Sequence, residues 1–399
     1  MTYHISTIDR AALRAYRLGR IQQQLRERDM PAALLFDPIN IRYATDCPNM
    51  QVWLLHNRVR YAFVPADGGV TLFEFPGAEH LSADIETIAE TRPGKSATYL
   101  ISGSDIDADT RAWAMDIDDL LRRAGGANRR LAVDVVDPHM TVALAGLGIR
   151  SENGTQVMEH ARWIKNDVEI LAMREAIQAC EKGMARMQAA LQPGITENAL
   201  FSILQQTNIE LGGEWIETRL LTSGPKTKPW FQECGHRQIE AGDLVSFDTD
   251  MIGPNGYCAD ISRSWLCGDV APTDEQRFIY RIAHEQIQHN FDLIRPGVSH
   301  RDISNAAYRV PERCQGTYYS MIAHGVGMCD EAPIIRHPWD LRDSSREDVC
   351  LDAGMVICVE ALVAVDDGRE AVKLEQMVHV TDDGPCLLND YPFEDALLA

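Results

Sequence analysis

The chain has 399 residues, of which 45% are hydrophobic and 24% are charged, and its formal net charge at pH 7 is −21. A chain of this length can bury two or three hydrophobic cores, and its composition is that of an ordinary globular protein. The strong negative charge argues against nucleic acids and anionic membranes as binding partners, because both would repel it.

Residues 1–155 alternate between helical and extended patterns, which is typical of an α/β domain. Helices are expected at 9–29 and 111–125, and strands at 32–36, 61–65, 70–75, 96–101 and 130–136. The polar, turn-forming run SENGTQ at 151–156 marks the end of this first domain near residue 155.

Residues 156–399 begin with a long helix, which Asn166 or Asp167 can cap. A second helix is expected from Thr196, and a capping-box pattern at 273–276 opens a third. Short extended runs lie between and after these helices. This order predicts an α+β domain in which helices cover an antiparallel sheet.

The chain shows no sign of export or of membrane insertion. Residues 1–25 have no apolar signal segment, and no other segment is long and uncharged enough to span a bilayer. The ten cysteines are scattered, without any Cys-x-x-Cys pair. We therefore expect a cytoplasmic protein with reduced thiols and no structural zinc site.

Three aspartates stand close together in the run SFDTDMIGPNGYCAD. On a strand, Asp248 and Asp250 would leave the same face because they are two residues apart. Asp260 follows a turn, and a three-residue loop at 254–256 would direct it to that same face, whereas a four-residue loop would not. Gly256 suits the left-handed backbone that the shorter loop requires. We predict one shared face; the alternative is an ordinary solvated acidic hairpin.

Three further polar residues lie alone in apolar runs. These are His324 in AHGVGMCDEAP, Glu360 in MVICVEALVAV and Glu375 in AVKLEQMVHV. A single histidine in such a run is often an ordinary core residue, but each buried carboxylate needs a partner. The five carboxylates sum to a charge of about −5, which two divalent cations would bring close to −1. Oxygen-rich ligation with one imidazole suits Mn, Fe, Co or Zn better than copper.

In this order, the motifs resemble the pita-bread metallopeptidase superfamily, which includes methionine aminopeptidase, aminopeptidase P, prolidase and the related creatinase. The resemblance covers residues 160–385, and the first domain resembles the N-terminal domain of the creatinase and prolidase branch. It implies a C-terminal pita-bread domain, at 156–399, that binds two divalent metal ions. The implied ligands are Asp260, His324, Glu360, Glu375 and an aspartate of the hairpin, for which Asp248 and Asp250 are both candidates.

The sequence departs from the peptidases at several positions. FDTD offers two aspartates where the peptidases have one, and Ala361 stands where a proline usually follows the first metal glutamate. Asp330 replaces a second active-site histidine, and Trp230, within KPWFQE, stands where another histidine is expected near the substrate. Peptide hydrolysis would lose both histidines, so we expect another reaction.

With FDTD, HGVGMCDEAP, GPKTKPWFQE and NIRYATD, the chain is most similar to the dimethylsulfoniopropionate lyases of this fold. The resemblance implies a homodimer that cleaves a small sulfonium zwitterion to dimethyl sulfide and acrylate. It also implies two bound metal ions, with iron as the expected metal and Mn, Zn or Co as alternatives. The alternatives are an Xaa-Pro aminopeptidase or dipeptidase, and a metal-free binding protein that keeps only the fold.

The resemblance also suggests roles around the substrate. Asp330 would be the base that removes the α-proton, with Tyr319 as the second candidate for proton transfer or substrate orientation. Adjacent Glu331 is a possible cause of a raised pKa at Asp330. An aromatic wall of Trp230 and Trp53 would hold the sulfonium by cation–π contact. Tyr318 is expected to be a core residue.

Overall fold

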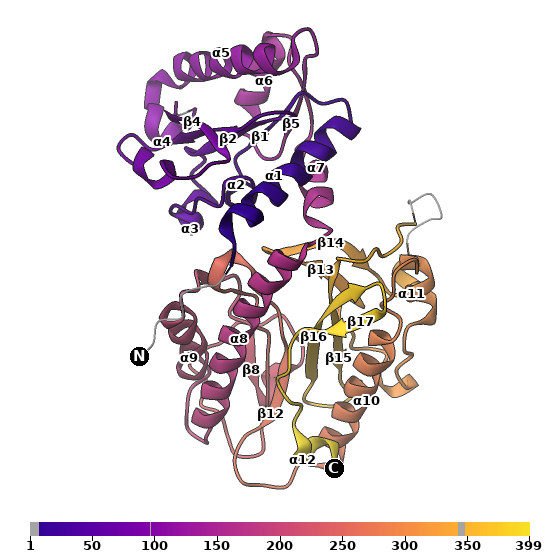
Figure 1. The fold of residues 1–399 in the computed structure, drawn as a ribbon. Coiled ribbons are helices and arrows are strands. Elements are labelled where there is room, and N and C mark those ends of the chain that lie inside the picture. Colours follow the sequence, from indigo (N-terminus) through magenta and orange to yellow (C-terminus); the bar gives the residue numbers. More distant parts are fainter. Residues whose placement is uncertain (1–7, 96, 342–347) are drawn as a thin grey trace. The chain divides into compact units, whose positions relative to one another are not determined.

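The computed structural model describes residues 8–95, 97–341 and 348–399, which form two compact units, 8–162 and 163–399 (Figure 1). The boundary follows Arg162 rather than residue 155, because helix α7 (Gly154–Arg162) packs against α1 (Arg10–Glu27). In the part of the chain that is described, no helix combines the length and apolarity needed to cross a bilayer.

The N-terminal unit is built on one mixed sheet with the strand order β4-β3-β2-β1-β5-β6. Its strands are β1 (Ala32–Leu35), β2 (Tyr61–Pro65), β3 (Val70–Glu74), β4 (Ile88–Pro93), β5 (Arg130–Val133) and β6 (Arg150–Asn153). Besides α1 and α7, its helices are α2 (Pro38–Thr45), α3 (Gln51–Leu54), α4 (Tyr99–Ser102), α5 (Ile106–Gly125) and α6 (Pro138–Gly146). The α/β prediction for this unit is confirmed.

One predicted strand of this unit, at 96–101, is wrong. Residues 99–102 form the short helix α4, while Ser96 lies outside the described residues. The side chains of Tyr99, Leu100 and Ile101 are exposed, so these three residues are not part of the core. A short apolar run does not distinguish a buried strand from a surface helical turn, because its periodicity is too brief.

The C-terminal unit contains three antiparallel sheets covered by helices. Its helices are α8 (Asp167–Ala190), α9 (Glu197–Glu210), α10 (Asp274–Phe291), α11 (His300–Ala306) and α12 (Asp395–Leu398). The two small sheets contain β7 (Trp215–Ile216), β8 (Leu221–Ser223), β9 (Leu244–Phe247), β10 (Met251–Ile252), β11 (Cys258–Ala259) and β12 (Arg263–Leu266). The large sheet has the order β14-β13-β15-β16-β17, from β13 (Ala323–Val326), β14 (Asp330–Ile335), β15 (Val356–Val363), β16 (Val372–Thr381) and β17 (Gly384–Leu387).

Three helices of this unit, α8, α9 and α10, begin with side-chain caps at the positions that the sequence predicts. Asn166 and Glu169 form a reciprocal capping box at the start of α8, and Thr273 and Gln276 form one at α10. The hydroxyl of Thr196 accepts a hydrogen bond at the start of α9. These local signals fix the residues at which three helices begin.

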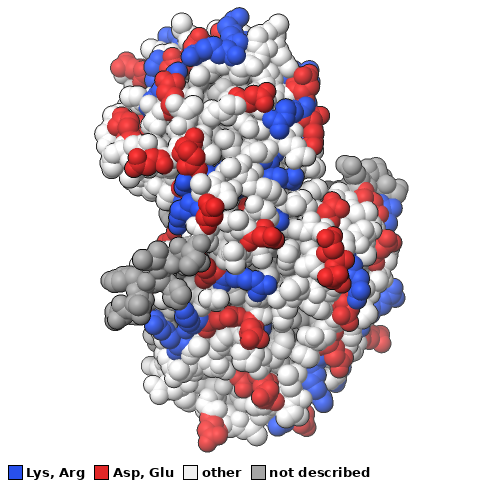
Figure 2. Space-filling model, in the orientation of Figure 1, with Lys and Arg blue, Asp and Glu red and all other residues white. Residues whose placement is uncertain are grey.

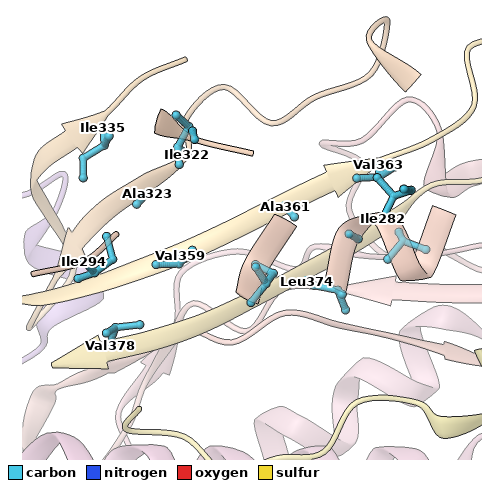
Figure 3. Packing of buried hydrophobic residues seen from close by; sticks show 14 of the residues in the cluster. Ile282, Ile294, Ile322, Ala323, Ile335, Val359, Ala361, Val363, Leu374 and Val378 are labelled. Atoms are coloured by element: carbon cyan, nitrogen blue, oxygen red, sulfur yellow. The ribbon is translucent and has the colours of Figure 1, made fainter. Parts of the chain in front are cut away.

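Strands β15 and β16 have two chemically different faces. Val359, Ala361 and Val363 of β15 share an apolar core with Leu374 of β16 and Ile282 of α10 (Figure 3). Since side chains alternate along a strand, the residues between them point to the opposite face of the sheet. That opposite face carries Cys358, Glu360, Lys373 and Glu375.

Acidic and basic side chains are mixed over the face seen in Figure 2. Among the described residues on this face, no broad area carries only Lys and Arg.

Candidate active site

The hairpin between β10 and β11 turns through a three-residue loop, as predicted. The amide of Gly253 donates to the carbonyl of Tyr257 at 2.9 Å, which leaves residues 254–256 as the loop. Asn255 and Gly256 both have left-handed φ angles, +66° and +75°. This loop length keeps the register that directs Asp260 toward Asp250.

The three aspartates converge, but not as neighbours along one strand. Asp248 follows the last residue of β9, Asp250 lies in a kink before β10 with φ +34°, and Asp260 follows β11. One carboxylate oxygen from each lies within 4.8 Å of the others. Asp248 and Asp260 are buried, while Asp250 is half-buried and accepts a hydrogen bond from the hydroxyl of Thr218.

The large sheet brings the other expected ligands to this spot. Glu360 on β15 is directly opposite Glu375 on β16, and His324 on β13 is opposite Cys358. His324 Nε2 lies 3.3 Å from Glu375, 3.5 Å from Asp260 and 3.7 Å from Glu360. All six expected ligand residues therefore come from separate segments to one cluster.

Two residues of the cluster were missed in the sequence. Cys358 Sγ lies within 4.8 Å of the ligand atoms of Asp260, His324 and Glu375. Lys373 is fully buried, and its Nζ lies 3.0 Å from Asp248 and 2.9 Å from Glu360 and from Glu375. The signal for Lys373 was its spacing of two from Glu375, which puts both on one face of a strand.

Burial and neighbouring charges shift the pKa values within the cluster, together at some residues and against each other at others. Burial raises the pKa of Asp260, and the nearby carboxylates raise it further. Burial also raises the pKa of Glu360, to about 8. At Glu375 burial acts in the same direction, but Lys373 and His324 outweigh it and lower the pKa below its ordinary value. Lys373 and His324 therefore stabilise the ionised form of Glu375.

The donor set fits divalent metal ions. Asp260 Oδ1, Glu360 Oε1 and Glu375 Oε1 are buried and accept no hydrogen bond from the described residues. Buried polar atoms without a partner are rare, because leaving one unsatisfied costs about 1–3 kcal/mol. Five carboxylates with one histidine match hard to borderline divalent ions, and Lys373 adds one positive charge.

Asp330 lies at the rim of this cluster, at the first position of β14. Its side chain is 61% exposed, and its Oδ1 lies 3.9 Å from His324 Nδ1. Partial burial raises its pKa, as does Glu375, while His324 lowers it. The suggestion that Glu331 raises this pKa is wrong: Glu331 is buried and pairs with Lys165 at 2.8 Å, since neighbouring strand residues point to opposite faces.

An aromatic group adjoins the cluster. The ring of Tyr319 lies 4.5 Å from Lys373 Nζ, and burial raises the pKa of its phenol, which keeps it protonated. Trp230 is buried, and Tyr319 packs against the small apolar cluster that Trp230 forms with Leu362 and its neighbours. The ring of Phe231, which the sequence analysis passed over, lies 5.4 Å from that of Tyr319.

Two other aromatic predictions turn out differently. Tyr318 is not a core residue; it is 41% exposed and contacts His337 and Trp339. Trp53 lies on α3 in the N-terminal unit, where its ring packs against Phe75 at 5.7 Å. Its expected role at the substrate stays a prediction.

Two sequence profiles match the chain. The profile of metallopeptidase family M24 matches residues 171–382, which is more than half of the chain, and the creatinase/prolidase N-terminal domain matches residues 17–145. The chain belongs to metallopeptidase family M24. It has the expected architecture, a pita-bread domain after a creatinase-like N-terminal domain, and M24 membership implies a dimetal site.

Two relatives of this M24 chain match it over nearly its whole length. The dimethylsulfoniopropionate lyase DddP of Roseovarius nubinhibens is 41% identical over 395 residues, covering 98% of this chain and 88% of the relative. The dimethylsulfoniopropionate lyase DddP of Roseobacter denitrificans is 39% identical over 402 residues, covering 100% and 90%.

Solved structures of dipeptidases share the fold. The Xaa-Pro dipeptidase from Bacillus anthracis superposes with a TM-score of 0.75 at 20% identity, covering 95% of this chain and 98% of that one. Dipeptidase PepE from Mycobacterium ulcerans gives 0.72 at 23% identity, covering 96% and 97%. At such identities the likeness concerns the fold alone.

Proposed function

We propose that this chain cleaves dimethylsulfoniopropionate to dimethyl sulfide and acrylate by base-initiated β-elimination. The observation that carries the proposal is the full-length similarity, at 41% identity, to a dimethylsulfoniopropionate lyase. A carboxylate at the rim of the ligand cluster, Asp330, supports it, because an elimination needs a base beside the site that binds the substrate carboxylate.

The residues have distinct tasks in this reaction. Two divalent ions, held by Asp248, Asp250, Asp260, His324, Glu360 and Glu375, would bind the substrate carboxylate and stabilise the negative charge that develops on it. Asp330 accepts the α-proton. The electron pair of that C–H bond forms the Cα–Cβ double bond, and the Cβ–S bond breaks with its electrons leaving on neutral dimethyl sulfide. Tyr319 remains a protonated phenol that can orient the carboxylate.

The second candidate is an Xaa-Pro aminopeptidase or dipeptidase. Its support is the shared fold of the solved dipeptidases. Against it, Asp330 and Trp230 occupy positions at which the resembled peptidases use histidine, so substrate binding and proton transfer would both be weakened. We expect negligible hydrolysis of an Xaa-Pro dipeptide.

A paired assay tests the proposal. Purified protein, analysed for metal and reconstituted where depleted, is given dimethylsulfoniopropionate with gas-phase detection of dimethyl sulfide and, separately, an Xaa-Pro dipeptide. Dimethyl sulfide release without dipeptide cleavage supports the lyase. Efficient cleavage of the dipeptide alone would favour the peptidase over the lyase. A protein that takes up no metal would refute both proposed activities.

The proposal extends to the metal, the assembly and the cellular location of the protein. By resemblance, iron is the expected metal and the homodimer the expected assembly. All ten cysteines are free thiols in the structure, which supports a reducing, cytoplasmic location. Elemental analysis of protein purified without added metal, and its mass in solution, test the first two points.

A further inference from the structure

Phe231 combines two features that are unfavourable for folding. Its side chain is 61% exposed, although it is a large apolar ring. Its backbone is left-handed, with φ +66°, a conformation that is uncommon and strained for a bulky residue. Neither feature benefits stability, which points to a contact that this phenylalanine makes outside the core.

The loop that carries Phe231 is firmly held. The carboxylate of Glu197 accepts hydrogen bonds from the amide and hydroxyl of Ser223, from Lys226 Nζ and from the amide of Gly235, at 2.6–3.0 Å. Lys228 Nζ donates to three backbone carbonyls of the turn after β15. The left-handed backbone at Phe231 is therefore imposed by a loop fixed on both sides.

This geometry arranges aromatic rings around one spot beside the ligand cluster. Phe231 meets Tyr319 at 5.4 Å with an interplanar angle of 34°. Tyr319 lies in turn beside Lys373, whose Nζ contacts three ligand carboxylates. Trp230, on the buried side of the same loop, has an indole N–H without a hydrogen-bond partner among the described residues. The exposed ring of Phe231 is thus separated from the ligand cluster, the proposed site of the substrate carboxylate, by the ring of Tyr319.

We propose that Phe231 is a specificity-determining residue that contacts the cationic end of the substrate. This inference rests on the proposed function in that it assigns the sulfonium, rather than a peptide, to the aromatic group. A substrate whose carboxylate is bound at the cluster extends its onium group toward the rings of Tyr319 and Phe231. A cation over an aromatic face is attracted by the electrons of the ring, and the attraction grows as the cation is desolvated.

Two inert ligands of equal shape separate charge from size. 3-(Dimethylamino)propionate is cationic at its nitrogen at neutral pH, whereas 4-methylpentanoate has a neutral carbon at that position; both carry the same carboxylate. We expect the metal-loaded protein to bind the cationic ligand about 10-fold more tightly, and this ratio to fall at least about 5-fold in Phe231→Leu. Phe231→Tyr keeps the ratio because it keeps an aromatic face.

Two further variants guard against a merely structural effect. Phe231→Gly relieves the left-handed backbone, so its thermal stability should not fall below that of the wild type, while the ligand preference is lost. Trp339→Leu is the matched control: Trp339 is 60% exposed in the same unit, in the separate cluster with Tyr318 and His337. It should leave the preference unchanged, and metal content should be equal in all variants.

The outcomes separate this inference from the lyase proposal. An active lyase whose Phe231→Leu variant keeps the full cation preference overturns the role of Phe231, as does an equal loss in Trp339→Leu. A protein that releases no dimethyl sulfide but shows the Phe231-dependent preference overturns the lyase proposal and leaves the onium contact standing.

Discussion

At the scale of single residues, a substitution of Asp330 tests the proposed reaction most directly. Asp330→Asn should lower the rate of elimination by about 10²–10⁴, because an amide cannot accept the α-proton at neutral pH. The side chain is 61% exposed, so the melting temperature and the metal content should stay close to those of the wild type.

The three readouts for Asp330→Asn distinguish three roles. A parallel fall in metal content would make Asp330 a ligand, and residual activity that follows the folded fraction would make it structural. A fully metallated variant with a near wild-type rate would remove Asp330 as the base, and Tyr319 would be tested next.

Lys373 offers a second test at this scale. Lys373→Met removes the cation that contacts Asp248, Glu360 and Glu375, which leaves buried negative charge uncompensated. Breaking such a pairing costs about 3–5 kcal/mol, or roughly 6–20 °C in melting temperature for a unit of this size. We expect this loss in the metal-free protein and a smaller one in the metal-loaded protein, where bound cations compensate.

Scanning calorimetry of both forms measures this difference, with Lys373→Arg as the charge-conserving control. An equal fall in the two forms would mean that Lys373 acts by packing alone. No change in the metal-free form would show that the carboxylates are protonated when no metal is bound.

At the scale of elements, the start of β14 depends on a buried ion pair. Asp330 and Glu331 are consecutive, and Glu331 is held by Lys165, which precedes α8; their side chains are 0% and 3% exposed. This pair positions the strand that carries Asp330, the proposed base. Lys165→Met should therefore cost about 3–5 kcal/mol of unfolding free energy and lower the turnover rate while metal content is kept.

A double-mutant cycle checks the pair. In Lys165→Met with Glu331→Met, most of the lost stability should return, because a buried ion pair replaced by apolar residues is often neutral. The exposed pair Arg186–Glu210 is the matched control, and Arg186→Met should leave the stability nearly unchanged. Strictly additive effects of Lys165→Met and Glu331→Met would contradict the coupling.

At the scale of the whole molecule, four buried or half-buried histidines contribute a pH dependence of stability. Burial lowers the pKa of His284, His300, His337 and His379 below the ordinary value. In the window between the unfolded pKa, about 6.5, and these lower folded values, the unfolded chain binds more protons than the folded one. Stability should therefore fall as pH decreases below about 6.5.

Urea unfolding of the metal-loaded protein between pH 7.5 and pH 5 measures this trend. His337→Gln should reduce the dependence of stability on pH. His337 is 5% exposed, so protonating it in the folded state is costly, and glutamine does not titrate. A midpoint that stays constant or rises towards pH 5 would show that other groups dominate acid stability.

The sequence by itself determined the features that depend on local periodicity. The capping boxes of α8 and α10, the three-residue loop at 254–256 and the isolated charges of β15 and β16 all follow from the geometry of a few consecutive residues. These features were enough to predict the two-domain architecture and to collect six candidate ligands, although the short helix α4 was taken for a strand.

Only the tertiary structure decided what the buried charges and exposed rings contact. Lys165 and Glu331 are 166 residues apart in sequence, and Phe231 meets Tyr319 through a loop fixed by Glu197. Each such contact joins segments whose approach is set by sheet pairing and by the packing of distant elements. No local pattern encodes that approach, because the free energy of a buried charge depends on the partners that the fold brings to it.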